Sequence, residues 1–222
     1  MCAGAGERMG PKYKDKQKCA LIVNGEGKPI IVQTVEKVMD CGIEEILLLT
    51  GHKAEQVEAC FNNFVARKKI NFIYCGDLSL GSVNTLEMLA KAKTFLKTPL
   101  PCIHGNLLFN QKAISSLLAA YYATFPEIII DVASQELAGV THYGVVYDEE
   151  MNIKRLLSGA NGLPTYMGID IFSTNFLKFG DQKGRPFLIK LFEQFLPEIG
   201  KAKANLYRET WFHLTTESDL KN

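Results

Sequence analysis

The sequence predicts an α/β fold with a mixed, mostly parallel sheet that is flanked by helices. Three observations support this fold. Apolar runs of strand length alternate with helix patterns between residues 18 and 104, which is typical of a parallel sheet with right-handed crossovers. The run from Ile46 to Leu49 is apolar without interruption, as expected of a strand covered on both faces. In addition, 47% of the 222 residues are hydrophobic, which is enough for one domain with a substantial core.

The first half of the chain predicts strands and helices in strict alternation. The strands are expected at residues 18–23, 45–50, 71–75 and 101–104. The first helix opens at Pro29, a residue that suits the first turn, and ends at Gly42. A second helix follows Gly51 and runs through Phe61, and a third covers residues 85–92. Because ligands bind beyond the carboxyl ends of such strands, we expect the loops at these strand ends to share one edge of the sheet, namely those at Gly4, Gly51, Gly81 and Gly105.

The second half of the chain has a less regular pattern. It predicts helices at residues 111–122 and 185–199, strands at 127–132 and 165–172, and a hairpin that pairs 143–147 with the segment after Ile153. Short strands are expected at 205–207 and 211–214, followed by a capped helix start at 216–219.

A glycine-rich loop opens the chain and carries the first chemical signal. Gly4 and Gly6 let backbone N–H groups approach phosphate oxygens closely, and Arg8 and Lys18 supply positive charge. A plain surface loop is the alternative, and the other lysines of this segment look like a solvated edge: Lys12, Lys14 and Lys16. Three residues precede Gly4, too few for a central strand of ordinary length, so we expect a truncated or misassigned start.

Composition excludes several classes of protein. The 25 basic and 24 acidic residues give a net charge of +1, which offers no support for nucleic-acid or membrane binding through bulk charge. We see no apolar run of membrane-span length and no signal peptide, so we expect a cytoplasmic protein. The six cysteines form no C-x-x-C pair, and buried free thiols in a reducing compartment are expected.

Motifs along the whole chain resemble those of sugar nucleotidyltransferases (nucleotide-sugar pyrophosphorylases). The opening Ala3-Gly4-Ala5-Gly6-Glu7-Arg8-Met9 with Lys18 is similar to their A-G-x-G-x-R-M … K signature. Further matches follow in order: Gly27-Lys28-Pro29, Thr50-Gly51-His52, Gly81-Ser82-Val83-Asn84, His104-Gly105-Asn106, Tyr143-Gly144-Val145-Val146, Gly168-Ile169-Asp170-Ile171-Phe172 and Trp211-Phe212-His213. The resemblance implies a single Rossmann-like domain, with a nucleotide-binding half at 1–110 and a sugar-binding half at 111–222.

The resemblance also implies a reaction and a set of site residues. A sugar 1-phosphate attacks the α-phosphorus of a nucleoside triphosphate, and pyrophosphate leaves. Arg8 and Lys18 would be catalytic. The other implied contacts are Ala3, Gly4, Gly6, Gly81 and Asn84 to the nucleotide and Gly144 and Gly168 to the sugar. Two carboxylates would hold Mg²⁺.

Both expected carboxylates are replaced in this sequence. Asn106 and His213 stand at the two metal positions, and Asp170 is a possible substitute that could equally be an ordinary polar strand residue. Asn106 could also be a plain turn residue, and His213 could pack against Trp211. Two functions therefore stay open: an active nucleotidyltransferase, and a catalytically impaired relative that binds nucleotide or a partner.

Overall fold

The computed structural model describes residues 1–4, 6–23, 27–76, 89, 99–133, 143–158, 162–183 and 188–221. The chain forms two compact units. The first comprises Met1–Val83, His104–Gln111 and Thr210–Asn222, and the second comprises Asn84–Ile103 and Lys112–Glu209. Three separate segments of the chain thus make up the first unit. The predicted functional division at residue 110 stays a prediction.

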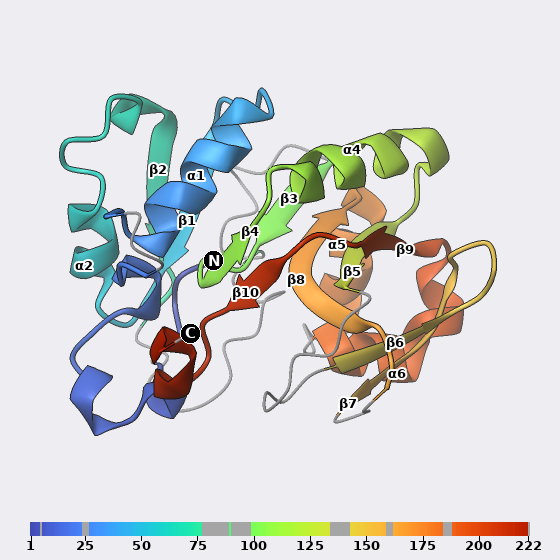
Figure 1. Cartoon of the computed structure of the whole chain (residues 1–222). Helices are drawn as coiled ribbons and strands as arrows, with labels where there is room; N and C mark the ends of the chain where they lie inside the picture. Colours follow the sequence, from blue (N-terminus) through green and yellow to red (C-terminus); the bar gives the residue numbers. More distant parts are fainter. Residues whose placement is uncertain are drawn as a thin grey trace. The chain divides into compact units, whose positions relative to one another are not determined.

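The first unit contains a parallel strand pair, with one helix before it and one between its two strands in sequence (Figure 1). Its elements are α1 (Ile30–Asp40), β1 (Ile46–Thr50), α2 (Ala54–Ala59), β2 (Ile70–Tyr74), β4 (Leu107–Phe109) and β10 (Trp211–His213). Strands β1 and β2 pair in parallel from Ile46↔Ile70 to Thr50↔Tyr74. Strands β4 and β10 pair antiparallel, with Trp211 opposite Phe109 and His213 opposite Leu107.

The residues before the glycine loop occupy the position of a strand. Cys2 forms a parallel bridge with Thr50, and its N–H donates to the Leu49 carbonyl oxygen at 2.7 Å. On the other side, the Gly105 N–H donates to the Met1 carbonyl oxygen at 2.9 Å. Strand-type contacts of these opening residues therefore reach both the end of β1 and the turn that contains Gly105.

Two of the glycines expected at the shared edge lie against these opening residues. A Cβ at Gly51 would be 2.7 Å from the Gly76 carbonyl oxygen and 2.9 Å from Ala3 Cβ, closer than real contacts allow. A Cβ at Gly105 would collide with Cys2 Sγ. The predicted meeting of these loops is confirmed for Gly51 and Gly105, whereas Gly81 lies outside the described residues.

A small apolar core anchors the glycine loop in the first unit. Met9 is 1% exposed and packs with buried side chains of the segment before α1, of α1, of β4 and of the segment after β10: Val23, Ile30, Leu108 and Leu214. Burying a methionine side chain contributes about 1.5–3 kcal/mol. The loop is therefore held by an apolar anchor within its own sequence motif.

The second unit is built around a mixed sheet. Its strands are β3 (Leu100–Ile103), β5 (Ile128–Ala133), β6 (Tyr143–Tyr147), β7 (Ile153–Ser158), β8 (Thr165–Phe172) and β9 (Ala202–Tyr207), and its helices are α4 (Lys112–Thr124), α5 (Thr174–Gln182) and α6 (Leu188–Ile199). The strand order is β7-β6-β8-β5-β9, and β3 also pairs with β8. Strands β5 and β9 are parallel, while β8 runs antiparallel to β3, β5 and β6.

The mixed sheet and its helices confirm the predicted fold class, with two corrections. Parallel pairing prevails in β1, β2 and residue 2, but most described strand pairs of the second unit are antiparallel. The expected strand at 18–23 is instead a short 3₁₀ turn over Lys18–Ala20. Its backbone N–H groups bond three residues back, from Ala20 to Gln17 at 3.0 Å and from Leu21 to Lys18 at 3.1 Å, so they are not used in a sheet.

Helix α5 was not predicted, and its start is explained by a local cap. The Ser173 hydroxyl accepts a hydrogen bond from the Phe176 N–H at 3.0 Å, which is the ordinary way to begin a helix. The helix expected at 85–92 lies in a part of the chain that, apart from Leu89, is outside the described residues.

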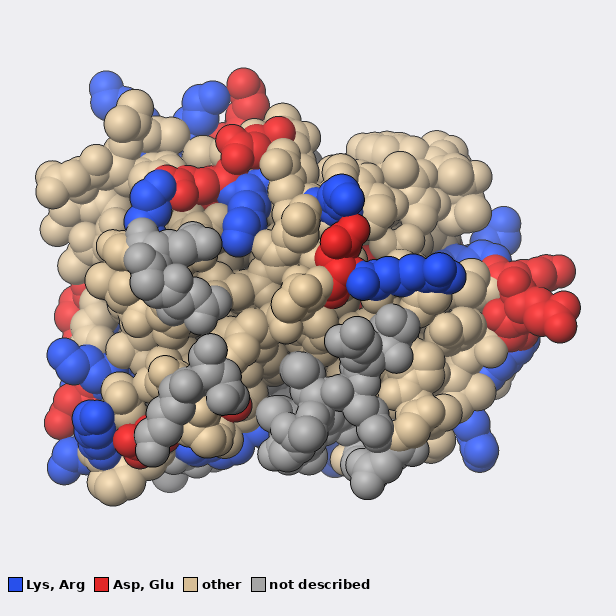
Figure 2. Space-filling model, in the orientation of Figure 1, with Lys and Arg blue, Asp and Glu red and all other residues tan. Residues whose placement is uncertain are grey.

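The surface and the cysteines agree with the composition. On the face drawn in Figure 2, Lys and Arg side chains lie among Asp and Glu side chains. No helix within the described residues is long and apolar enough to cross a membrane. All six cysteines are free thiols; four are buried, and Cys41 and Cys60 are partly exposed.

Candidate functional site

The glycine loop has a backbone that only glycine adopts easily. Gly6 has a φ of 73° and Gly10 a φ of 79°, both in the left-handed region. Between them a 3₁₀ turn over Glu7–Met9 begins with the Met9 N–H donating to the Gly6 carbonyl oxygen at 2.8 Å. The buried Met9 and the two glycines therefore hold Arg8 at the exposed outer side of a tight turn.

Lys18 lies against this loop. A Cβ at Gly6 would be 3.4 Å from Lys18 Cγ, so the lysine side chain runs directly over the glycine. Burial lowers the pKa of Lys18, and the nearby Arg8 guanidinium lowers it further. The repulsion between two cations at a glycine loop is offset when an anion binds between them. The structure thus brings Gly6, Arg8 and Lys18 together as the sequence predicts.

Asn106 and His213, the predicted metal positions, come together on the β4–β10 side of the same unit. The Asn106 Nδ2 donates to the Leu214 carbonyl oxygen at 2.7 Å, and the Leu214 N–H donates to the Asn106 carbonyl oxygen at 3.0 Å. This pair of bonds extends the ladder by one step beyond His213. The Asn106 side chain therefore links the turn before β4 to the segment after β10 by a hydrogen bond.

Aromatic rings surround His213. Its ring centroid lies 6.4 Å from that of Trp211, with 27° between the planes, and 6.4 Å from that of His104. The predicted packing of His213 with Trp211 is thereby observed. Removal of water from the His104 ring lowers its pKa to about 4, and the charge of Lys18 also lowers it. The imidazole of His104 is therefore neutral near pH 7 and lies within the electrostatic range of Lys18.

The side chains at the two metal positions do not fit Mg²⁺ as a carboxylate pair would. Mg²⁺ prefers charged oxygen ligands, whereas an amide and an imidazole bring no negative charge. The Asn106 amide is also oriented by its bond to Leu214. Within the described residues, no group of three His, Cys, Asp or Glu side chains could hold a metal ion.

Asp170, the suggested substitute ligand, lies in β8 of the second unit. It is fully buried, and its Oδ2 accepts a hydrogen bond from the Tyr166 hydroxyl at 2.8 Å. Burial raises the pKa of Asp170 well above its ordinary value, which disfavours the charged form that binds a metal ion best. This arrangement favours the interpretation of Asp170 as a polar strand residue over that of a metal ligand.

The two glycines predicted to contact the sugar have clear roles in the sheet. Gly144 is buried in β6 between Leu157 of β7 and Thr165 of β8. Gly168 has a φ of 88° and lies where the β5–β8 register shifts. A bulge at this point needs a residue without a Cβ. Contacts of these glycines with a sugar stay a prediction.

The remaining predicted contacts divide into two groups. Ala3 is buried, and its carbonyl oxygen accepts the His52 N–H at 3.3 Å, while Gly4 accepts a side-chain bond from Gln17 at 3.2 Å. Gly81 and Asn84 lie outside the described residues. Gln17 itself escaped the sequence reasoning, because a glutamine inside a run of exposed lysines looks like part of a solvated edge.

Asp219, in the predicted capped segment at 216–219, has a position near Lys18 that the sequence did not reveal. Its Oδ2 accepts the N–H groups of Thr215 and Thr216 at 2.8 and 2.7 Å. Its charge raises the pKa of Lys18, although less than burial lowers it. The predicted capped helix start at 216–219 is instead a 3₁₀ turn over Glu217–Lys221, which the Asp219 carboxylate caps within electrostatic range of Lys18.

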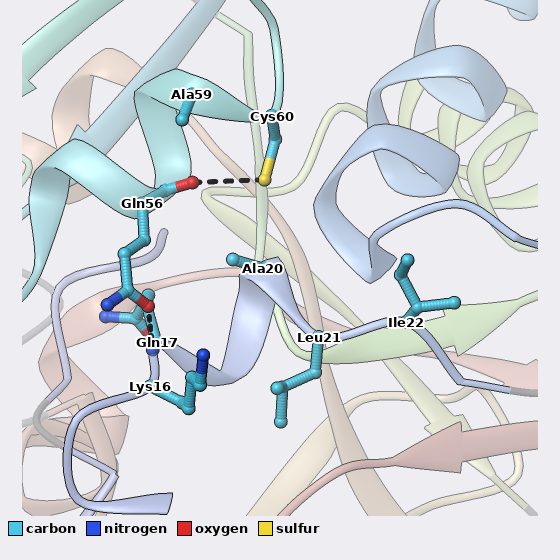
Figure 3. Close-up of a pocket in the computed structure, with 8 residues that line it drawn as sticks. All are labelled: Lys16, Gln17, Ala20, Leu21, Ile22, Gln56, Ala59 and Cys60. Atoms are coloured by element: carbon cyan, nitrogen blue, oxygen red, sulfur yellow. Dashed lines mark hydrogen bonds between the residues drawn. The ribbon is translucent and has the colours of Figure 1, made fainter.

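A pocket of about 580 Å³ lies behind the segment that leads to Lys18 (Figure 3). It is lined by Lys16, Gln17, Ala20, Leu21, Ile22, Gln56, Ala59 and Cys60. Arg8 and Lys18 do not line it, and apolar side chains make up much of its wall. It is therefore poorly suited to a triphosphate, which needs charged and backbone donors.

Comparison with known sequences finds two informative relatives, although no protein-family model matches the chain. The chain is 29% identical over 157 residues to the bifunctional protein GlmU of Methanocaldococcus jannaschii. The matched region covers 70% of this chain and 34% of that protein. It is 28% identical over 137 residues to a CMP-5'-(3-aminopropyl)phosphonate synthase of Streptomyces rubellomurinus, covering 62% and 20%. The chain thus spans 34% and 20% of the length of these two relatives.

Comparison with solved structures shows the same fold over nearly the whole chain. The inositol-1-phosphate CTP transferase of T. maritima superposes with a TM-score of 0.78 at 14% identity, covering 99% of this chain and 89% of that one. The CTP:phosphocholine cytidylyltransferase of Streptococcus pneumoniae superposes with a TM-score of 0.71 at 14% identity, covering 99% and 93%.

Proposed function

We propose that the chain belongs with the sugar nucleotidyltransferases and transfers a nucleoside monophosphate from a nucleoside triphosphate to a phosphate acceptor; its 29% identity to GlmU over 157 residues and the fold that it shares with an inositol-1-phosphate CTP transferase support this proposal. The acceptor class is a sugar 1-phosphate or a similar phosphate or phosphonate, and pyrophosphate is released. One observation carries the proposal: the glycine loop holds Arg8 and Lys18 in each other's electrostatic range, with Lys18 packed on Gly6.

The reaction suits a loop of this construction. An acceptor phosphate oxygen attacks the α-phosphorus, the bond from that phosphorus to the bridging oxygen breaks, and the pyrophosphate carries away the negative charge. Catalysis of such a transfer depends on positioning and on cations that stabilise charge. Arg8 would hold the leaving pyrophosphate through its planar fork of donors, and Lys18 would stabilise the α-phosphate. Gly4 and Gly6 would leave backbone N–H groups close to the phosphates.

The metal requirement of this chain is a separate question within the proposal. In the resembled family Mg²⁺ neutralises phosphate charge, but the amide of Asn106 and the ring of His213 are poor substitutes for carboxylates. We therefore assign no step of the reaction to a metal held by these two residues. We expect the cytoplasm as the place of action, as the sequence suggests.

The test is pyrophosphate release. The protein is incubated with each of the four nucleoside triphosphates, Mg²⁺ or Mn²⁺, and a panel of sugar 1-phosphates, phosphocholine, inositol 1-phosphate and an aminoalkylphosphonate. Removal of one charge-assisted contact costs about 1.5–3 kcal/mol. Arg8→Ala should therefore lower kcat/KM by about 10- to 100-fold. The matched control is Lys14→Ala, which removes an exposed charge from the same segment and should have little effect.

A different outcome would support the binding protein that the sequence left open. If no combination releases pyrophosphate while a nucleoside triphosphate still raises the melting temperature, the chain binds nucleotide without turnover. The loss of that thermal shift in Arg8→Ala would then locate the binding at the glycine loop.

A further inference from the structure

Gln17 is buried in a segment whose neighbours are exposed. Its side chain and backbone are 1% exposed, whereas Lys14 and Lys16 beside it are exposed. Its Nε2 lies within hydrogen-bonding distance of three carbonyl oxygens: Cys2 at 3.1 Å, Gly4 at 3.2 Å and His52 at 2.8 Å. An amide nitrogen has two hydrogens, so the three acceptors share them.

These three carbonyl groups belong to the two segments that form the base of the glycine loop. Cys2 and Gly4 lie in the opening strand-like segment, and His52 lies in the turn after β1. The His52 N–H in turn donates to the Ala3 carbonyl oxygen at 3.3 Å. A single side chain therefore joins the start of the loop to the carboxyl end of β1.

Gln17 is itself held by helix α2. Its backbone N–H donates to Gln56 Oε1 at 2.8 Å, and Gln56 Nε2 donates to the Asp15 carbonyl oxygen at 2.7 Å. Figure 3 shows the two glutamines side by side, with the first of these bonds drawn. Because Lys18 follows directly in sequence, the same contacts determine where the backbone of Lys18 lies.

We propose that Gln17 is a positioning residue for the phosphate site. By engaging the carbonyl groups of Cys2 and Gly4, it keeps these oxygens directed inward, away from an anion that they would repel. It also anchors the backbone from which Lys18 reaches over Gly6. The role of an anion in this inference rests on the proposed function, but the ordering of the loop by Gln17 does not.

The first test compares Gln17→Met with a matched control, Gln33→Met. Both glutamines are buried in the first unit, but Gln33 makes its side-chain bond to the Lys28 carbonyl oxygen at 3.0 Å, in the turn before α1. Amide hydrogen exchange is measured by mass spectrometry for peptides that cover residues 2–10. We expect Gln17→Met to raise the exchange rate of these peptides by about tenfold or more, and Gln33→Met to leave it unchanged.

Kinetics provide the second readout. Misplacement of a catalytic group by about 1 Å can lower a rate by roughly 100-fold. We therefore expect kcat/KM for pyrophosphate release to fall by about 10- to 100-fold in Gln17→Met, with KM for the nucleoside triphosphate raised as well, because the displaced loop no longer holds the phosphate groups in place. A loss of stability alone would reduce the active fraction and leave KM unchanged, as we expect for Gln33→Met.

Gln17→Glu adds a pH-dependent readout and serves if the methionine variant does not fold. A protonated carboxyl can donate one hydrogen bond to the carbonyl cluster, whereas a carboxylate cannot donate. Loop protection in Gln17→Glu should therefore recover as the pH falls and be lost as it rises, and the loop in Gln33→Glu should show no such change. Equal loop exchange in the Gln17 and Gln33 variants would overturn the inference. Absence of turnover in the unmodified protein would instead count against the proposed function, while the exchange data would still decide the role of Gln17.

Discussion

Asn106 stands at a predicted metal position but forms a hydrogen bond to Leu214. Its replacement by aspartate tests whether this bond stabilises the fold. In the resembled family an aspartate stands here, so the substitution restores the expected ligand. In this structure, however, Asn106 Nδ2 donates to the Leu214 carbonyl oxygen at 2.7 Å. A carboxylate has no hydrogen to donate, so Asn106→Asp places two oxygens that repel each other at this distance.

The loss of stability can be estimated from that one hydrogen bond. A buried acceptor that loses its donor costs about 1–3 kcal/mol, more when a charge is involved. We therefore expect Asn106→Asp to lower the free energy of unfolding by about 1–3 kcal/mol at pH 7. Asn106→Leu removes the same donor without adding charge and serves as the control.

The pH dependence identifies the cause. The carbonyl oxygen opposite the introduced carboxyl raises its pKa in the folded state above the unfolded value, because the protonated form alone can donate. Between the unfolded and the folded pKa the native state holds the extra proton, so stability falls as the pH rises. The deficit of Asn106→Asp should thus be small near pH 4 and grow through pH 7, whereas that of Asn106→Leu should stay constant.

Urea denaturation followed by circular dichroism measures these differences, with and without Mg²⁺. An added carboxylate that binds Mg²⁺ would raise the unfolding midpoint as the ion concentration increases. If Asn106→Asp is as stable as the unmodified protein at pH 7 without metal, the hydrogen bond between Asn106 and Leu214 does not stabilise the fold, and our interpretation is wrong.

Two further substitutions test close packing and buried charge. Gly51→Ala should lower the free energy of unfolding by about 1–3 kcal/mol, because its Cβ would lie 2.7 Å from the Gly76 carbonyl oxygen; an unchanged urea midpoint would contradict this close approach. Asp131 is fully buried and accepts a 2.6 Å bond from Asn205, and burial raises its pKa to about 8. The native state therefore keeps a proton that the unfolded chain loses near pH 4, so stability should fall by up to about 1.4 kcal/mol per pH unit between these values. Asp131→Asn should remove this share of the slope in thermal unfolding curves recorded from pH 5 to pH 8, and identical slopes in both proteins would refute the buried neutral carboxyl.

The glycine loop and the metal positions differ in how much local sequence could reveal about them. Gly4, Gly6, Arg8 and Lys18 lie within one short segment, and the backbone freedom of glycine and the charge of Arg and Lys are properties of the residues themselves. The structure accordingly brings Gly6, Arg8 and Lys18 together as expected. The role of Asn106 depends on a partner 108 residues away, which no local pattern contains.

Asp170 illustrates the same difference in the second unit. Its position in a strand was predicted correctly, because alternation within residues 165–172 is a local property. The rise of its pKa was not predicted, because it depends on burial in the folded chain, which outweighs the opposing hydrogen bond from Tyr166. A carboxyl that looks like a candidate ligand in sequence is a buried, hydrogen-bonded core group with a raised pKa in the fold.

The sequence by itself determined the fold class, the extents of most strands and the glycine loop that brings Gly6, Arg8 and Lys18 together. These features follow from the spacing of apolar residues and from the chemistry of single side chains, both of which a linear sequence records. Tertiary structure alone decided that the Gln17 side chain donates hydrogen bonds to three carbonyl groups at the base of that loop. It alone also decided that the segment after Thr210 returns to the first unit and bonds to Asn106. A sequence shows which groups can form hydrogen bonds, but only the folded chain brings a particular donor to a particular acceptor.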